Sequence, residues 1–270
     1  MVDFNDTIIK INNLLNENHM SFDEKRFQPF ERQFSEVYNY AQEKELPNTV
    51  LSVSLLPCFL LPKQEGQFPH NDDGVTAEIY MHHALSMAKL LIDVHPEITN
   101  EEEDIALSTA ICHVLVEKVA FEKKGIELVS DYGLDQQVYD TIQTNLRKGR
   151  WDTEFYERIQ QNKIALLVKL ADRCNVIQQL YMSSISEAQK FINDTKHNFF
   201  SMCIYGKENY PDLYMVISLL MEKMRNLVDV MDIMSSRHIE RENALHKEIL
   251  FLKEENSKIR TIIKELKEGQ

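Results

Sequence analysis

Three ionisable side chains of this 270-residue chain lie inside apolar stretches with helical spacing, and this feature most constrains its fold. His83 lies in HHALSMAKLL, His113 in AICHVLVEK and Asp172 in LLVKLADRCN. A buried neutral polar group without a partner costs roughly 2–7 kcal/mol, and a buried charge costs far more. The sequence therefore predicts that these groups satisfy one another, with a metal ion as the obvious common partner. The alternative is that each is an ordinary hydrogen-bonded core residue.

Taken in order, the three stretches resemble the motifs of the HD superfamily of metal-dependent phosphohydrolases. The closest likeness is to the guanosine polyphosphate (alarmone) hydrolase domains of the RelA/SpoT type. The resemblance covers roughly residues 75–215, and VKLADR is its most specific part. It implies that His83, His113 and Asp172 hold a divalent metal ion, manganese by family resemblance. It also implies that Glu117 positions or deprotonates the attacking water.

The motif is incomplete in this chain. Val114 stands where the superfamily has the aspartate that follows the second histidine, and Lys118 replaces one member of the acidic pair of which Glu117 is kept. The basic segment that holds the guanine in the family is reduced to Gly66–Gln67, and the asparagine of its DRLHN motif has a near counterpart only in Asn175. Hard divalent cations prefer carboxylate oxygens, so the missing aspartate predicts weaker metal binding.

Two functional hypotheses follow from these matches and departures. The first is a degenerate HD-domain protein with lost or altered activity, which binds a nucleotide or acts as a dimeric interaction module. The alternative is an active divalent-metal-dependent phosphohydrolase of a guanosine polyphosphate or a related nucleotide. A further ligand, from His82, Asp72 or Asp73, could take the place of the missing aspartate.

Composition excludes several other classes. A net charge of −13 argues against a nucleic-acid-binding protein, and 43% apolar with 27% charged residues is typical of a soluble globular protein. The start, MVDFNDTIIKINNLL, does not resemble a signal peptide, and no apolar run is long enough to span a membrane. Four scattered cysteines without a CxxC pair predict reduced, buried thiols in a cytoplasmic protein: Cys58, Cys112, Cys174 and Cys203.

The chain is expected to be all-α, because only 7 Gly and 7 Pro leave few places to turn. Helical spacing predicts helices over residues 3–16, 23–43 and 135–146 and a long helix from residue 161. The apolar segment 52–63 is interrupted by Pro57 and Pro62, so it is expected to be a buried irregular segment or short helices.

Two further patterns concern the ends of helices and a set of aromatic residues. Thr99 and Glu102 form a capping box that should open the helix of His113. The aromatic stretch beyond residue 190 could stack a nucleobase, although packing between helices is the favoured interpretation: His197, Phe199, Phe200 and Tyr205.

The C-terminal segment carries a strict seven-residue repeat. Leucine or isoleucine occupies the d positions (Leu245, Leu252, Ile259 and Leu266), and the a positions are Ile249, Asn256 and Ile263. This pattern, with one asparagine at a, favours a parallel two-stranded coiled coil and hence a homodimer. A lone amphipathic helix folded back on the bundle is the alternative. The expected organisation is an N-terminal helical extension (1–70), an HD-like helical domain (71–235) and a coiled-coil helix (236–270).

Overall fold

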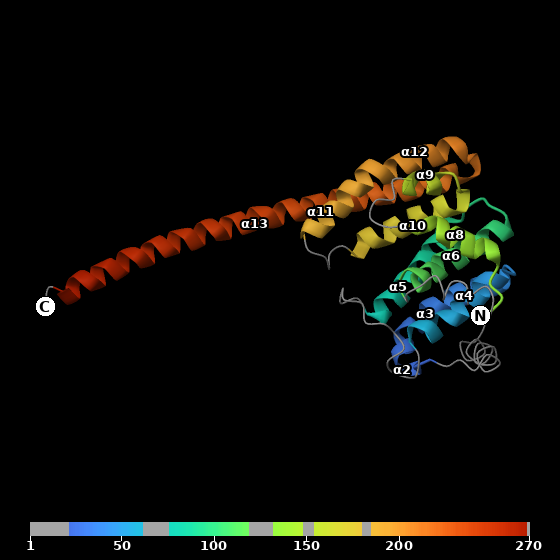
Figure 1. The fold of residues 1–270 in the computed structure, drawn as a ribbon, viewed down its shortest axis with the longest axis horizontal. Helices are drawn as coiled ribbons and strands as arrows, with labels where there is room; N and C mark the ends of the chain where they lie inside the picture. The colour runs from blue at the N-terminus through green and yellow to red at the C-terminus, as the bar shows by residue number, and fades with distance from the viewer. Residues whose placement is uncertain (1–21, 62–75, 119–131, 148–153, 180–184, 269–270) are drawn as a thin grey trace.

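The computed structural model describes residues 22–61, 76–118, 132–147, 154–179 and 185–268. Every regular element among these residues is a helix, which confirms the all-α prediction (Figure 1). The described helices between residues 24 and 209 form a compact bundle, and the last helix leaves this bundle as a long arm. None of the described helices is both long and apolar enough to cross a membrane.

The first described helices correspond closely to the expected helix over residues 23–43. Asp23 caps α2 (Glu24–Phe27) by accepting hydrogen bonds from two backbone amides of its first turn. A short 3₁₀ turn, η1 (Gln28–Phe30), contains a proline and separates α2 from α3 (Glu31–Glu43). Phenylalanines of this region are buried in the same core as the later helices, so the described part of the expected N-terminal extension is packed into the bundle.

The prediction for the proline-containing segment 52–63 was right about burial and wrong about the backbone over its described part, residues 52–61. Residues Pro47–Leu60 form one continuous helix, α4, with Pro57 inside it. Most of its side chains are buried, and it packs closely on the helix of His113. Pro57 lies in the last turn, where its ring removes a single intrahelical hydrogen bond, and burial of the surrounding apolar side chains outweighs that loss. Asp104 also stabilises the start of α4 by accepting hydrogen bonds from the backbone amides of Asn48 and Thr49.

Three helices at the centre carry the three sequence motifs. They are α5 (Ala77–Val94), α6 (Asn100–Lys118) and α10 (Lys163–Gln179), and they pack against one another. The predicted capping box is present, since Glu102 N donates to Thr99 Oγ1 over 3.2 Å and Thr99 N donates to Glu102 Oε2 over 3.1 Å. This packing brings one face of each helix to a common point inside the bundle.

Shorter helices complete the bundle beside α10. These are α8 (Gln136–Asn145), α9 (Phe155–Gln160), α11 (Ile185–Asp194) and α12 (Phe200–Asn209). A five-residue π-helical turn, η3 (Thr195–Phe199), joins α11 to α12, and a 3₁₀ turn, η4 (Pro211–Leu213), follows α12. π-Helical turns occur often at functional sites, and this one lies beside α10.

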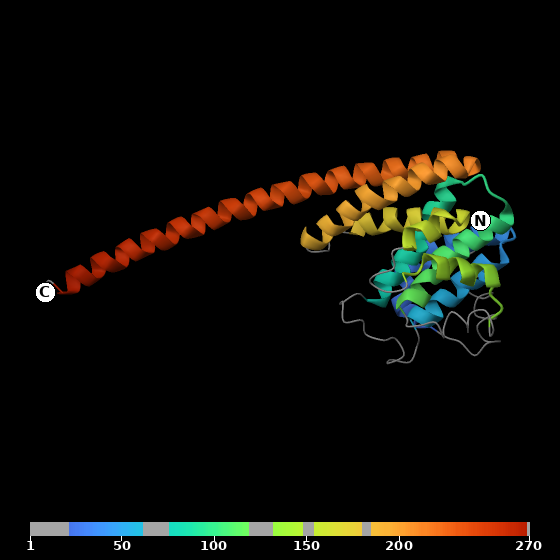
Figure 2. The same ribbon diagram turned by 45° about the horizontal axis from the view of Figure 1, so that its top comes forward.

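The last helix, α13 (Tyr214–Glu268), begins in the bundle and continues far beyond it. Figure 2 shows from a second angle that the arm does not bend back onto the bundle. The side chains described between residues 245 and 260 are almost all exposed, so the alternative of a helix folded back on its own bundle was wrong.

Several predictions lie outside the described residues. They are the helix over 3–16, the Gly66–Gln67 counterpart of the basic segment, and the possible ligands Asp72 and Asp73.

Candidate metal centre

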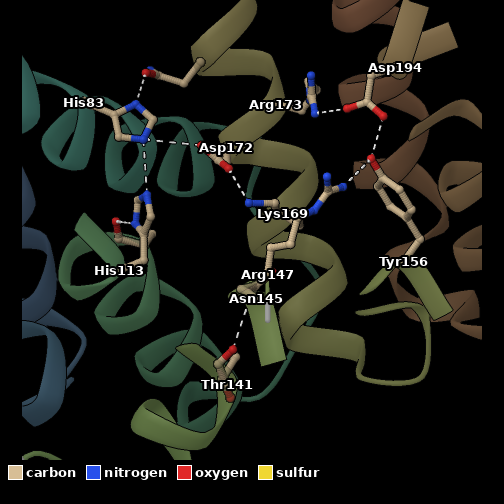
Figure 3. A network of polar contacts seen from close by, with 12 residues as sticks. His83, His113, Thr141, Asn145, Arg147, Tyr156, Lys169, Asp172, Arg173 and Asp194 are labelled. Atoms are coloured by element: carbon tan, nitrogen blue, oxygen red, sulfur yellow. Dashed lines mark hydrogen bonds and ion pairs between the residues drawn. The ribbon is translucent and has the colours of Figure 1, made fainter. Parts of the chain in front are cut away.

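The structure brings His83, His113 and Asp172 together although 89 residues of sequence separate the first from the last. His83 Nε2 lies 3.2 Å from His113 Nε2 and 3.3 Å from Asp172 Oδ1, and the three atoms all lie within 4.8 Å of one another (Figure 3). Ligand atoms about 2.0–2.2 Å from one cation are separated by about 3.0–3.5 Å, so the two short distances match neighbouring ligands of a single ion. Both imidazoles are buried, at 8% and 5% exposure.

The second ring nitrogen of each histidine is held by a backbone or amide oxygen. His83 Nδ1 donates to Asn175 Oδ1 over 2.7 Å, and His113 Nδ1 donates to the carbonyl oxygen of Ala110 over 2.7 Å. A carbonyl oxygen only accepts, so each Nδ1 carries a proton and each neutral ring presents Nε2 as an acceptor. Metal-binding histidines are oriented in this way, with one nitrogen fixed by a hydrogen bond and the other turned to the ion.

The site therefore concentrates acceptor atoms around one point. Two imidazole nitrogens and a carboxylate oxygen face one another, and this arrangement requires a positive charge between them, either a metal ion or a proton shared by the imidazoles. Asn175, which sequence analysis named only as an imperfect match to the family motif, supports this site through His83. It lies three residues after Asp172 on α10, so the two side chains share a helix face, and this spacing was the signal for it.

Asp172 is ionised and already has one cationic partner. Lys169 Nζ donates to Asp172 Oδ2 over 2.9 Å, and both side chains are mostly buried, with 14% and 15% exposure. Burial alone would raise the pKa of Asp172, but the adjacent ammonium of Lys169 holds this pKa well below its usual range. The carboxylate is thus available to a cation at all ordinary pH values.

The remaining sequence candidates divide into those that the structure places away from this cluster and those it leaves undescribed. His82 is exposed on α5 and lies near Ser86, so it does not replace the missing aspartate. Val114 is buried at 2% exposure and offers no ligand atom. The backbone of Glu117 belongs to α6, but its side chain, like Asp72 and Asp73, lies outside the described parts of the chain.

A pocket rich in basic and aromatic side chains lies next to the cluster. The volume of this pocket is about 380 Å³. Lys169 connects the pocket to the His83–His113–Asp172 cluster, because it lines the pocket and contacts Asp172. The lining residues come from α8 to α11 and the segments beside them: Asn145, Arg147, Phe155, Tyr156, Lys169, Arg173, Lys190, Phe191 and Asp194. Four cations against one carboxylate make it a basic site on a chain with a net charge of −13.

A network around Asp194 fixes one wall of this basic pocket. Asp194 accepts hydrogen bonds from Arg173 and Tyr156, both at 2.5 Å, and Arg147 donates to the hydroxyl of Tyr156 over 3.1 Å (Figure 3). Burial raises the pKa of Tyr156, and its hydrogen bond to Asp194 raises it further. Burial would also raise the pKa of Asp194, but its hydrogen bonds and the charge of Arg173 lower it overall.

One polar atom of the pocket has no partner among the described residues. Asn145 is 4% exposed, and its Nδ2 donates to the carbonyl of Thr141, whereas Oδ1 makes no hydrogen bond there. A buried acceptor without a partner costs about 1–3 kcal/mol, and a ligand with a hydrogen-bond donor would relieve this cost.

One of the aromatic residues named from the sequence clearly packs between helices, which was the favoured interpretation, and does not line the pocket. Phe199 is 1% exposed, with the guanidinium of Arg173 stacked 3.8 Å from its ring centroid. Phe199 therefore packs between helices, and the pocket is lined by Phe155, Tyr156 and Phe191. The four cysteines are buried free thiols as predicted, and burial raises the pKa of each to about 12.

No protein-family model matches the chain, and no curated protein matches it significantly.

Proposed function

We propose that this chain is an HD-like module that holds one divalent cation beside a phosphate-bearing nucleotide, with hydrolytic activity lost or altered. The observation that carries the proposal is the convergence of His83, His113 and Asp172 with both Nδ1 atoms turned outward to fixed acceptors. The HD-superfamily resemblance of the three motifs gives the same ligand set and suggests manganese and a guanosine polyphosphate. Geometry and motif resemblance are separate arguments, and both point to one site.

The charges of the site favour joint binding of a cation and an anion. Asp172 and Lys169 compensate each other, so a divalent cation would leave two uncompensated positive charges in a mostly buried place. The adjacent pocket adds further cations, which include Arg147 and Lys190. A phosphate group bridging the cation and the basic pocket would neutralise both, and arginine is well suited to bind it in bidentate fashion. Nucleotide and metal should therefore strengthen each other's binding.

The chain's own departures from the motif support lost or altered activity. Val114 replaces one carboxylate of the family's ligand set. The ammonium of Lys169 partly compensates the charge of the remaining carboxylate, Asp172. With three protein ligands, several positions around a cation stay open, which fits binding of a phosphate and gives less control over a reacting water.

A second candidate is an active phosphohydrolase, which the survival of both histidines and Asp172 in one cluster favours. A bound divalent cation would supply a Lewis acid and lower the pKa of water. In this reading Asp172 and the two histidines hold the ion, the basic pocket positions the phosphate chain, and Glu117, one helical turn after His113, positions the water.

Thermal unfolding with manganese, with and without guanosine polyphosphates, tests the proposal. We expect manganese to raise the melting temperature, and the nucleotide to enlarge this shift, because ligands that bind only the folded state stabilise it. His83→Ala and Asp172→Asn should abolish the shift, whereas His82→Ala, a matched change at the exposed neighbour, should retain it. If divalent ions do not change the melting temperature of the parent protein, the metal site is refuted.

Phosphate release separates the two candidates. The same nucleotides are incubated with manganese and the parent protein, with Asp172→Asn as control. Nucleotide binding without phosphate release supports the first candidate, a module with lost or altered hydrolytic activity. Phosphate release that depends on Asp172 supports the hydrolase.

A further inference from the structure

Helix α13 carries a seam with one heptad phase, and its two apolar halves have different environments. Positions that alternate three and four residues apart run from Ile217 to Leu266 without a change of phase. The first half of the seam faces the bundle, with Ile217, Met224 and Val228 at 0–1% exposure. In the second half Leu245 is 51% exposed, and the following members are exposed to similar extents: Ile249 49%, Leu252 56% and Ile259 52%.

Polar residues separate the two halves. Ser235, His238 and Glu242 occupy consecutive seam positions where the helix leaves the bundle. Among the side chains whose burial is described, Ser235 is the last buried one, and His238 and Glu242 are exposed and paired with each other at 3.4 Å. The apolar seam thus resumes only after its own bundle has ended, so nothing in the described chain covers its second half.

We infer that a second copy of this chain covers the exposed half of the seam, in a parallel, in-register two-stranded coiled coil that begins at Leu245. The seam residues are the a and d positions of heptads, with isoleucine at a and mainly leucine at d, a choice that favours two parallel strands. Asn256 is an exposed a residue. In a dimer its amide meets the same amide of the partner copy, which fixes register and disfavours larger assemblies.

The flanking charges select the parallel orientation. Glu248 and Glu255 occupy g positions, whereas Lys253 and Arg260 occupy e positions. In a parallel dimer each g residue faces an e residue of the other chain, so every such pair joins opposite charges. In an antiparallel dimer g faces g and e faces e, which would place like charges together. Charge complementarity therefore specifies another copy of this sequence, oriented the same way.

Cysteine cross-linking in the full-length chain tests the arrangement. The four native cysteines are buried at 0–6% exposure, so an introduced surface cysteine is the reactive thiol among the described positions. Ile249→Cys, at an a position, should form a covalent dimer under mild oxidation. Lys247→Cys, at the outward f position two residues earlier, should not. Failure of Ile249→Cys to cross-link, or equal cross-linking of both variants, would overturn the parallel in-register coil.

Charge exchange tests that the partner is a second copy. Glu248→Lys alone replaces two attractive contacts per dimer with repulsive ones, and we expect a roughly three- to tenfold rise in the dimer dissociation constant. Adding Lys253→Glu should restore the parent value. Sedimentation equilibrium measures both, and a monomeric or trimeric parent chain, or a double variant no better than the single one, would contradict the inference.

Discussion

Lys169 Nζ lies 2.9 Å from Oδ2 of Asp172, so an ion held by His83, His113 and Asp172 would share this carboxylate with an ammonium. The same ammonium lines the basic pocket. Lys169 therefore links the two halves of the proposed site, with opposite effects on each: it competes with a divalent cation and attracts a phosphate.

Removing this ammonium should separate the two effects. In Lys169→Met we expect manganese affinity to rise by about tenfold or more at about pH 8, because a positive charge within a few ångströms of the ion is lost. Affinity for a nucleotide should fall in the same variant. Isothermal titration with each ligand measures both. Lys89→Met, which removes an exposed lysine paired with Asp93, should leave both affinities unchanged. If Lys169→Met lowers the affinity for manganese and for the nucleotide equally, Lys169 acts only as a structural residue.

Restoring the carboxylate of the family motif should strengthen metal binding. Val114→Asp introduces a charge at a position with 2% exposure, so the metal-free protein should lose several kcal/mol of unfolding free energy. Manganese should recover part of that loss and bind more tightly than to the parent. Val116→Asp, also buried at 5% exposure, provides the matched control, because it should destabilise without improving binding. Identical manganese responses of the two variants would mean that residue 114 does not face the cluster.

Asn175 should matter for metal binding although it offers no ligand to the ion. Asn175→Ala removes the acceptor for His83 Nδ1 and leaves the ring free to turn or change tautomer. Loss of such an orienting partner typically lowers metal affinity 10–100-fold, and we expect a loss in this range. Asn198→Ala, which removes an amide bonded to Asp194, should not change manganese affinity. A manganese titration that does not distinguish Asn175→Ala from the parent would contradict this role.

The Asp194 network should make stability depend on acidity. The folded-state pKa of Asp194 is lowered, so its contribution is present above the unfolded value of about 4 and is lost as pH falls through the folded pKa. Asp194→Asn should cost about 2 kcal/mol at neutral pH, because Arg173 remains mostly buried without its partner, and it should flatten the decline of stability in acid. Denaturant unfolding between neutral pH and pH values below about 4 measures both effects. A variant as stable as the parent at neutral pH would show that the pair is screened by solvent.

The sequence predicted the convergence of three residues better than the structure around them. His83, His113 and Asp172 were identified because an ionisable residue in an apolar helical stripe requires a partner, and the structure brings them together. The helix through Pro57 was missed because a proline within an apolar run indicates a break, whereas Pro57 lies in the last turn of α4 and interrupts little of it. The basic pocket was also missed. Arg147, Arg173 and Lys190 are distant in sequence, and only the packing of α8 to α11 makes them neighbours.

The metal content of the purified protein tests the central claim most directly. Elemental analysis after incubation with manganese and removal of unbound ions should find one divalent ion per chain in the parent and in His82→Ala. It should find essentially none in His83→Ala or Asp172→Asn, because each lacks one of the three ligands. A parent protein without bound metal, or variants that retain as much metal as the parent, would contradict the claim that His83, His113 and Asp172 form a metal centre.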